Sequence, residues 1–313
     1  MLTARFLFVR CCRLDRWILH GRCRLPVLCL VLMAVTALPG SLAAQVKQPN
    51  EIIKFRLSDG YLIVVQTIIN GTGPYSFLLD TGTTRTVIDP DLARQLQTPA
   101  IGEASITTVL HVRQDKLVQL ENVAMGEASV PDLGAVVDKL ARQKLLAPGI
   151  RGVLGEDFLS RFDILIDYKK RLLRIGDPPP AGERSRFETI GQYRGSPTTN
   201  RLLIGVDFVD VSGGKLQLQL DTGAKTLELF PPSHDSLASQ PWGGFMATSN
   251  GANGMIIHSD ITIKIGTTLI RNLDVVQSRR SIAFDAVGLL PASIFHRIYI
   301  SHSGGFVVLN PVE

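Results

Sequence analysis

The chain has 313 residues, of which 45% are hydrophobic and 19% are charged, a composition typical of a globular protein of about two domains. The formal net charge of +5 comes from residues 1–44, which hold six of the 33 basic residues and one of the 28 acidic residues. The rest of the chain therefore has 27 residues of each sign, which argues against nucleic acid as a partner.

Residues 1–44 have the pattern of an export signal. A basic stretch precedes the apolar run Val27–Leu38, and the segment "SLAAQ" supplies small residues for cleavage after Ala43 or Ala44. Because this run is shorter than the about 20 residues that cross a membrane, we expect a cleaved signal peptide and a periplasmic or secreted protein. An uncleaved N-terminal anchor is the alternative, and it would be the chain's only contact with a membrane. All four cysteines lie in this segment, so we expect no disulfide and no cysteine-based metal site in the rest of the chain. The histidines show no ligand spacing, and we expect no metal and no cofactor.

The chain from Glu51 onward is predicted to be β structure. The segment "YLIVVQTII" is rich in β-branched residues, the turn "NGTGP" follows it, and the strand "YSFLLD" ends at Asp80. In the next segment, "IDPDLARQL", Asp89 is placed to cap a short helix that begins at Pro90. The sequence thus predicts a hairpin that presents Asp80 at the end of its second strand.

A proline-rich segment divides the chain into two parts. Residues 177–185 contain three consecutive prolines, which cannot enter a central strand, and they are predicted to be a linker. We therefore expect one lobe over residues 45–176 and a second over 186–313. In the second lobe, "NRLLIGVDFVD" and "KLQLQLD" are predicted strands, and the latter ends at Asp221.

The two lobes repeat two motifs in the same order. "FLLDTGTTRTVID" contains Asp80 and "LQLDTGAKTLEL" contains Asp221, 141 positions later. "GVLG" begins at Gly152 and "GLLP" begins at Gly288, 136 positions later. Two motifs at nearly the same offset indicate an internal duplication of whole domains.

Duplication gives the two aspartates a chemistry that neither has alone. If the lobes pack about a pseudo-twofold axis, equivalent turns meet there and Asp80 faces Asp221. Two adjacent carboxylates share a proton. One then acts as a general base toward water, and the protonated partner polarises a carbonyl group. This mechanism requires no cysteine, serine triad or metal.

Both lobes resemble the retropepsin-like aspartic protease family, and in particular its exported bacterial members. "NGTGPYSFLLDTGTTRTVID" is similar to the family's active-site strand and turn, and "GVLGEDFL" is similar to its psi loop. "LQLDTGAKTLEL" and "GLLPASIF" repeat these motifs. The resemblance implies an all-β fold of two tandem closed β-barrel lobes related by a pseudo-twofold axis, with a few short helices. It also implies flap hairpins, which would lie over 106–123 and 245–264.

The resemblance also implies site residues and a function. Asp80 and Asp221 would be catalytic, and the turns would be held by Thr81, Gly82, Thr83, Thr222 and Gly223. The chain would be an exported aspartic endopeptidase, acting on peptides or proteins as a monomer in which the lobes form an intrachain pseudo-dimer. One alternative is a non-catalytic peptide-binding or scaffold protein with a degenerate second lobe. Another is an enzyme in which each lobe pairs with its twin in a second molecule.

Two differences make the lobes unequal. Thr83 follows the first Asp-Thr-Gly, where its hydroxyl can donate to the Asp80 carboxylate and favour the charged form. Ala224 stands at the equivalent position and cannot donate. Pro291 occupies the place of Gly155, and since proline fixes φ and removes a donor, we expect a looser or differently routed second psi loop.

Overall fold

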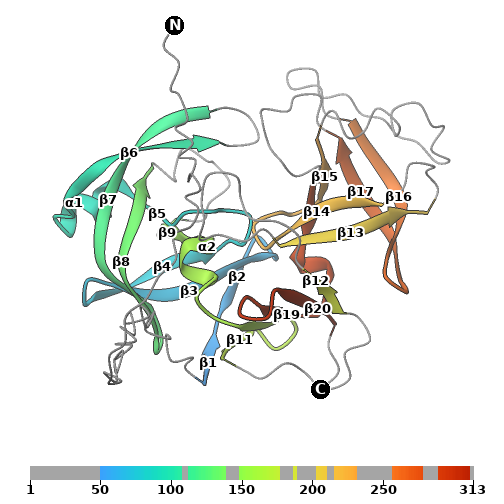
Figure 1. Ribbon diagram of the computed structural model, residues 1–313, viewed down its shortest axis with the longest axis horizontal. Helices are drawn as coiled ribbons and strands as arrows, with labels where there is room; N and C mark the ends of the chain where they lie inside the picture. Colours follow the sequence, from blue (N-terminus) through green and yellow to red (C-terminus); the bar gives the residue numbers. More distant parts are fainter. Residues whose placement is uncertain are drawn as a thin grey trace, which may run out of the picture. The chain divides into compact units, whose positions relative to one another are not determined.

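The computed structural model describes residues 50–107, 112–138, 148–176, 186–188, 202–209, 215–230, 256–277 and 288–310 (Figure 1). The predicted leader and the predicted linker lie outside the described residues, so their boundaries stay predictions. The first predicted flap falls on the β6–β7 hairpin except for residues 108–111, and residues 245–255 of the second predicted flap also lie outside the described residues.

The first half of the chain forms an eight-stranded sheet that pairs back onto itself. Its strands lie in the spatial order β2 (Arg56–Ser58), β3 (Leu62–Ile69), β4 (Thr72–Leu79), β9 (Ile150–Leu154), β5 (Val87–Ile88), β8 (Ala128–Val137), β7 (Val112–Met125) and β6 (Ala100–Thr107). An additional antiparallel pairing of β3 with β7 joins the sheet into a ring. Two short helices, α1 (Pro90–Gln95) and α2 (Glu156–Leu159), follow β5 and β9.

The second half repeats this arrangement as a closed six-stranded barrel. Its strands lie in the order β13 (Leu203–Phe208), β14 (Leu216–Asp221), β18 (Gly288–Pro291), β15 (Leu227–Leu229), β17 (Thr268–Gln277) and β16 (Ile256–Ile265). The short 3-10 helix η2 (Ala292–Ile294) follows β18, as α2 follows β9. In each half, the strand before the Asp-Thr-Gly turn runs parallel to the strand of the second motif, so β4 pairs with β9 and β14 pairs with β18.

A third sheet contains strands from both halves, and the sequence did not predict it. Its order is β1 (Glu51–Lys54), β11 (Leu172–Ile175), β10 (Ile164–Asp167), β19 (Arg297–Ser301), β20 (Phe306–Leu309) and β12 (Arg186–Glu188). The equivalent strands β10 and β19 pair antiparallel at its centre, with Ile164 opposite Ile300. The all-β, two-lobe prediction is therefore confirmed, but the lobes share a sheet in addition to their own strands.

Local sequence signals explain how the first hairpin and helix form. Asn70 and Gly71 both have positive φ, at 49° and 72°, which is the geometry of the tight turn that fits the twist of a hairpin. The Asp89 side chain accepts hydrogen bonds from the backbone N–H groups of Asp91 and Leu92 at the start of α1, and Pro90 is the first helical residue. The predicted hairpin and helix cap are confirmed, but the turn is shorter than predicted, because β4 already begins at Thr72.

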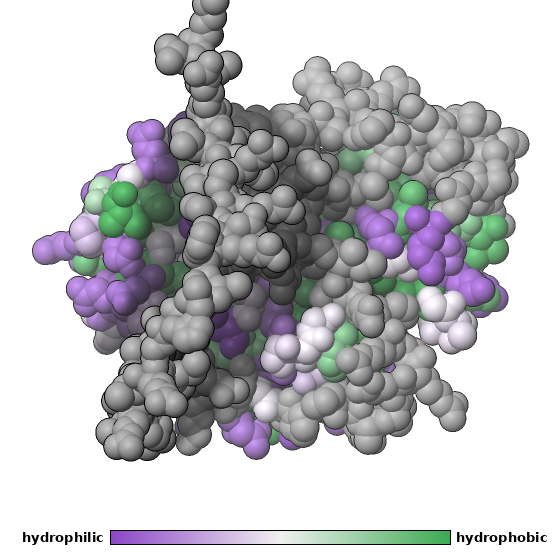
Figure 2. Space-filling view, viewed as in Figure 1, coloured by the Kyte–Doolittle hydropathy of each residue, from purple (hydrophilic) through white to green (hydrophobic). Residues whose placement is uncertain are grey.

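Apolar residues of the strands fill the interior of both lobes. Among the residues that the structure describes, the exposed large hydrophobic side chains lie on four separate segments, at Ile52, Ile101, Val209 and Leu269. Figure 2 shows hydrophilic and hydrophobic residues intermixed over the described residues of the face in view. Among the described residues, no helix is both long and apolar enough to cross a bilayer.

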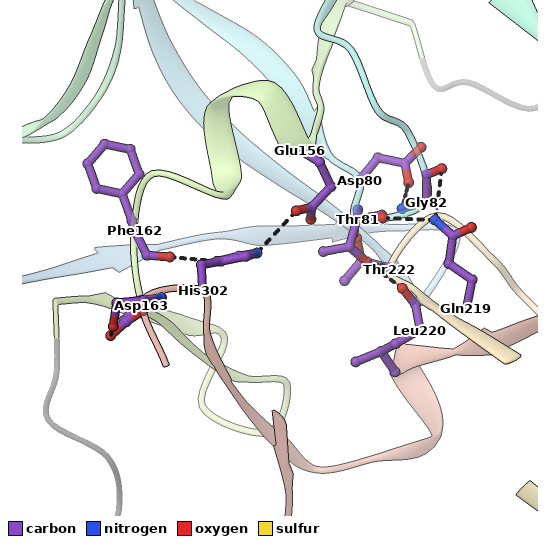
Figure 3. A network of polar contacts seen from close by, with 11 residues as sticks. Asp80, Thr81, Gly82, Glu156, Phe162, Asp163, Gln219, Leu220, Thr222 and His302 are labelled. Atoms are coloured by element: carbon purple, nitrogen blue, oxygen red, sulfur yellow. Dashed lines mark hydrogen bonds and ion pairs between the residues drawn. The ribbon is translucent and has the colours of Figure 1, made fainter. Parts of the chain in front are cut away.

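A buried histidine–glutamate pair joins the two halves (Figure 3). His302, in the turn after β19, has its Nε2 atom 3.1 Å from Oε2 of Glu156, the first residue of α2. Its Nδ1 atom lies 2.6 Å from the Phe162 carbonyl oxygen, which can only accept, so Nδ1 carries a proton. Burial by itself would lower the pKa of His302, but the Glu156 charge and the hydrogen bonds to Glu156 and Phe162 outweigh burial and raise this pKa.

Candidate active site

The two Asp-Thr-Gly turns begin at equivalent points of the two halves. Asp80 follows β4, and its backbone N–H donates to the Leu154 carbonyl oxygen of β9 at 3.0 Å. Asp221 is the last residue of β14 and lies opposite Pro291 of β18. Each aspartate thus stands where two parallel strands end together, which fixes its backbone on a rigid part of the fold.

Hydrogen bonds within each turn hold the carboxylates. The Gly82 N–H donates to Asp80 Oδ1 at 2.8 Å, and the Gly223 N–H donates to Asp221 Oδ1 at 2.6 Å. The Thr83 hydroxyl donates to Asp80 Oδ2 at 2.8 Å. The structure thus contains the bond that the sequence predicted for Thr83, and Ala224 offers no counterpart to Asp221. The two carboxylates therefore have equivalent positions but different sets of donors.

Reciprocal hydrogen bonds connect the two turns across the halves (Figure 3). The Thr81 N–H donates to Thr222 Oγ1 at 3.0 Å, and the Thr222 N–H donates to Thr81 Oγ1 at 3.1 Å. The two hydroxyls donate in turn to backbone carbonyl oxygens, from Thr81 to Leu220 at 2.9 Å and from Thr222 to Leu79 at 2.7 Å. The sequence suggested that each threonine fixes its own turn, whereas each one instead holds the turn of the other half.

The two glycines allow each carboxylate to pack against the opposite turn. A Cβ atom placed on Gly82 would lie 2.5 Å from Asp221 Cγ, and one placed on Gly223 would lie 2.9 Å from Asp80 Oδ2. Real Cβ atoms do not approach heavy atoms this closely. Asp80 and Asp221 therefore come together as the duplication predicted, each against the glycine that follows the other aspartate.

The environment of Asp221 disfavours its charged form. Burial raises the pKa of Asp221 well above its usual range, and the neighbouring Asp80 carboxylate raises it further. The hydrogen bond from Gly223 acts in the opposite direction but does not offset these effects. Two adjacent carboxyl groups in such a site hold a proton between them more readily than either would alone.

The segments after β9 and β18 follow the same route, which corrects one expectation. Pro291 lies in register with Asp221 in the parallel β14–β18 pair, so the second psi loop is not differently routed. Proline is tolerated because it is the last residue of β18, where the lost donor interrupts no further pairing. At Gly155 the backbone approaches closely instead, since a Cβ atom there would lie 2.6 Å from the Arg85 carbonyl carbon.

Three further side chains near the aspartates were not identified from the sequence. Gln219 is buried, and its Nε2 atom donates to the carbonyl oxygens of Thr81 and Gly82 at 3.3 and 3.2 Å. Glu228 raises the pKa of Asp221, and Tyr61 has a pKa raised by burial, by Asp59 and by both turn aspartates. The alternation of apolar and polar residues in "LQLQLD" could have identified Gln219, because residues two apart share one face of a strand and Asp221 follows two residues later.

The histidines of the described region do not gather around a metal. His258 Nε2 lies 2.8 Å from the Gln277 side-chain oxygen, and His302 is paired with Glu156. Within the ranges that the structure describes, no group of three or more His, Cys, Asp or Glu side chains is placed to hold an ion.

A two-lobe β fold with one Asp-Thr-Gly turn from each lobe is the arrangement of the aspartic protease class. The family model described as "gag-polyprotein putative aspartyl protease" matches residues 65–161, which include the first turn and its psi loop. Over these residues the chain is similar to that family.

One solved structure shares the two-lobe fold of this chain. The aspartic proteinase from Irpex lacteus is similar over 85% of this chain and 98% of its own, with a TM-score of 0.55 and 12% sequence identity. A retropepsin-like aspartic protease from Rickettsia conorii is 19% identical and aligns over 41% of this chain and 91% of its own, with a TM-score of 0.30. No curated protein sequence matches the chain.

Proposed function

We propose that this protein is an exported aspartic endopeptidase in which Asp80 and Asp221 of one molecule together activate water for peptide-bond hydrolysis. The observation that carries the proposal is the reciprocal packing of each carboxylate against the glycine of the opposite turn. Because both aspartates come from one chain, the active form is a monomer. Export is proposed from the basic and apolar pattern of residues 1–44.

The mechanism uses one proton shared by the two carboxyl groups. Water bound between Asp80 and Asp221 loses a proton to the ionised carboxylate as its oxygen attacks the peptide carbonyl carbon. The protonated carboxyl group donates a hydrogen bond to the carbonyl oxygen, where negative charge develops. The resulting tetrahedral intermediate breaks down when the leaving nitrogen is protonated, and no acyl-enzyme forms.

The two carboxyl groups accept different numbers of hydrogen bonds, and this difference indicates which one is the general base and which one is the general acid. Asp80 accepts from both Gly82 and Thr83, and hydrogen bonds to a carboxylate favour its charged form. Asp221 is buried and lacks the hydroxyl donor, so it carries the shared proton. Asp80 is therefore the general base and Asp221 the general acid in the first step.

The experiment that tests the function is cleavage of a mixed peptide library by the purified chain. We expect internal peptide bonds to be cut, and we expect a statine-containing peptide, which mimics the tetrahedral intermediate, to block the reaction. A non-catalytic peptide-binding protein would leave every peptide intact even where it bound statine, and that result would contradict the proposal.

Replacement of Gly82 by alanine is expected to lower kcat/KM by about 100-fold or more, because small misplacements of reacting groups have effects of this size. The added Cβ atom would lie 2.5 Å from Asp221 Cγ, so that the carboxyl group has to move. Gly134→Ala is the matched control, since a Cβ atom there meets nothing closer than 3.6 Å. Equal activity of the two variants would show that the carboxylates need not pack against the turns.

A further inference from the structure

Glu228 lies on the same face of the second barrel as the catalytic Asp221. Its neighbours in β15, Leu227 and Leu229, are fully buried in the core, so Glu228 points to the opposite face. Across the sheet Glu228 lies opposite Leu289, and Leu289 lies opposite Gln219 of β14. Because residues directly opposite one another share a face, Glu228 and Gln219 flank Leu289, and Asp221 follows two residues after Gln219.

The electrostatic effects of Glu228 agree with this placement. Glu228 raises the pKa of Asp221 and also that of Tyr61, so its carboxyl group is close enough to influence both. Burial raises the pKa of Glu228 itself. In the part of the chain that the structure describes, Glu228 has no hydrogen-bond or ion-pair partner to compensate for that burial.

Gln219 adds a second acceptor with no partner. Its Nε2 atom is committed to the Thr81 and Gly82 carbonyl oxygens, which fixes the orientation of the amide. Its Oε1 atom is buried and has no hydrogen-bond partner. A buried acceptor without a donor is costly, and the partly buried carboxylate of Glu228 likewise lacks a cation among the described residues. The Glu228 carboxyl group and the Gln219 Oε1 atom are therefore two acceptors without donors on the strand face that also carries Asp221.

The first half has apolar residues at the equivalent positions. There Val87 lies opposite Val153, which in turn lies opposite Leu78, two residues before Asp80. Val87 thus occupies the place of Glu228, and Leu78 occupies the place of Gln219. The strand face beside Asp221 therefore carries two hydrogen-bond acceptors, whereas the equivalent face beside Asp80 carries apolar side chains at the same two positions.

We propose that Glu228 and the Oε1 atom of Gln219 form a cation-binding subsite beside Asp221, which selects a lysine or arginine side chain of the peptide substrate. This inference rests on the proposed function, since the peptide is the substrate that this function supplies. Ammonium and guanidinium groups carry three and five N–H donors and no acceptor, which suits a carboxylate and an amide oxygen. A peptide that crosses both halves places this cation on one flank of the scissile bond only.

The test compares two statine-containing peptides that differ at a single residue next to the statine, which is lysine in one peptide and leucine in the other. One such pair varies the residue on the N-terminal side of the statine, and a second pair varies the residue on the C-terminal side. Binding is measured by calorimetry on the wild-type chain, on Glu228→Gln and on Glu127→Gln, which alters an exposed carboxylate in the β7–β8 turn. The ratio of the two Kd values for one protein cancels any general effect of the substitution on the aspartates.

We expect the wild-type chain to bind the lysine peptide about 10- to 100-fold more tightly at one flank, the range for hydrogen bonds to charged groups. Glu228→Gln removes most of this preference, and Glu127→Gln preserves it. Equal affinities at both flanks, no measurable binding of either peptide, or a preference that survives Glu228→Gln would overturn the subsite. Failure of the proposed function is seen separately, as absence of cleavage by a chain that still shows the lysine preference.

Discussion

Replacement of either Asp80 or Asp221 by asparagine is expected to reduce peptide cleavage by at least about 1,000-fold, within the range that general acid–base groups contribute. Asparagine preserves the size of the side chain but can neither take a proton from water nor share one. The double variant is expected to be no worse than either single variant, because the two carboxyl groups act as a unit. Cleavage rates for the three variants against one peptide test this.

The control is Asp91→Asn, which changes an exposed carboxylate in the first turn of α1 and should leave cleavage unchanged. Both active-site variants are expected to unfold at no lower temperature than the wild-type chain, since each removes one of two adjacent carboxyl groups that disfavour each other's ionisation. Turnover close to the wild-type value in both variants would contradict the catalytic roles.

The pH profile of the wild-type chain follows from the shared proton. The proposed mechanism requires one proton on the pair, so activity is expected to be lost at low pH, when both carboxyl groups are protonated, and at high pH, when the last proton leaves. Because the pKa of Asp221 is raised, the alkaline limb is expected above the usual range of an aspartate. An alkaline limb at the ordinary aspartate pKa would contradict the assignment of the shared proton to Asp221.

Replacement of His302 by alanine is expected to lower the free energy of unfolding by about 3–5 kcal/mol, the cost of leaving one partner of a buried pair alone. Glu156 would remain buried with its Oε2 atom unpaired, and its Oε1 atom already has no partner. Urea unfolding near neutral pH measures the effect. The double variant Glu156→Leu with His302→Leu is the control, because it replaces the pair with apolar groups and should recover most of the loss.

The contribution of this pair also depends on pH. Since the pKa of His302 is raised in the folded state, its stabilisation is fully present below the unfolded value of about 6.5 and is lost as pH rises through the folded value. The carboxylates that face it are Glu156 and Asp163, and both act to raise this pKa. The same loss of stability with rising pH in His302→Ala would show that another group is responsible.

The sequence predicted those parts of the fold that short local signals specify. The turn at Asn70-Gly71, the cap at Asp89 and the strands that end at Asp80 and Asp221 all depend on a few adjacent residues. The shared six-stranded sheet does not depend on adjacent residues, because the pairing of β10 with β19 joins residues that are 130 or more positions apart. Neither strand carries a turn or motif that identifies its partner.

The candidate site divides in the same way. The repeated Asp-Thr-Gly motif was enough to predict that Asp80 lies close to Asp221. The hydrogen bonds between Thr81 and Thr222 could not be predicted, because they depend on how the halves pack. Glu228 was missed because "TLEL" is an unremarkable strand segment until the register shows which residue it lies beside. Polar residues of a strand usually face solvent, and only a known register distinguishes those that face a site.

The reciprocal hydrogen bonds between Thr81 and Thr222 can form only late in folding. Thr81 and Thr222 each complete a turn made by a distant part of the chain, so neither turn has its full set of hydrogen bonds until both halves are present and packed. During synthesis the first half emerges alone, with Asp80 but without its partner. Under the proposed function, hydrolytic capacity would therefore arise only after both halves have been made and have packed together.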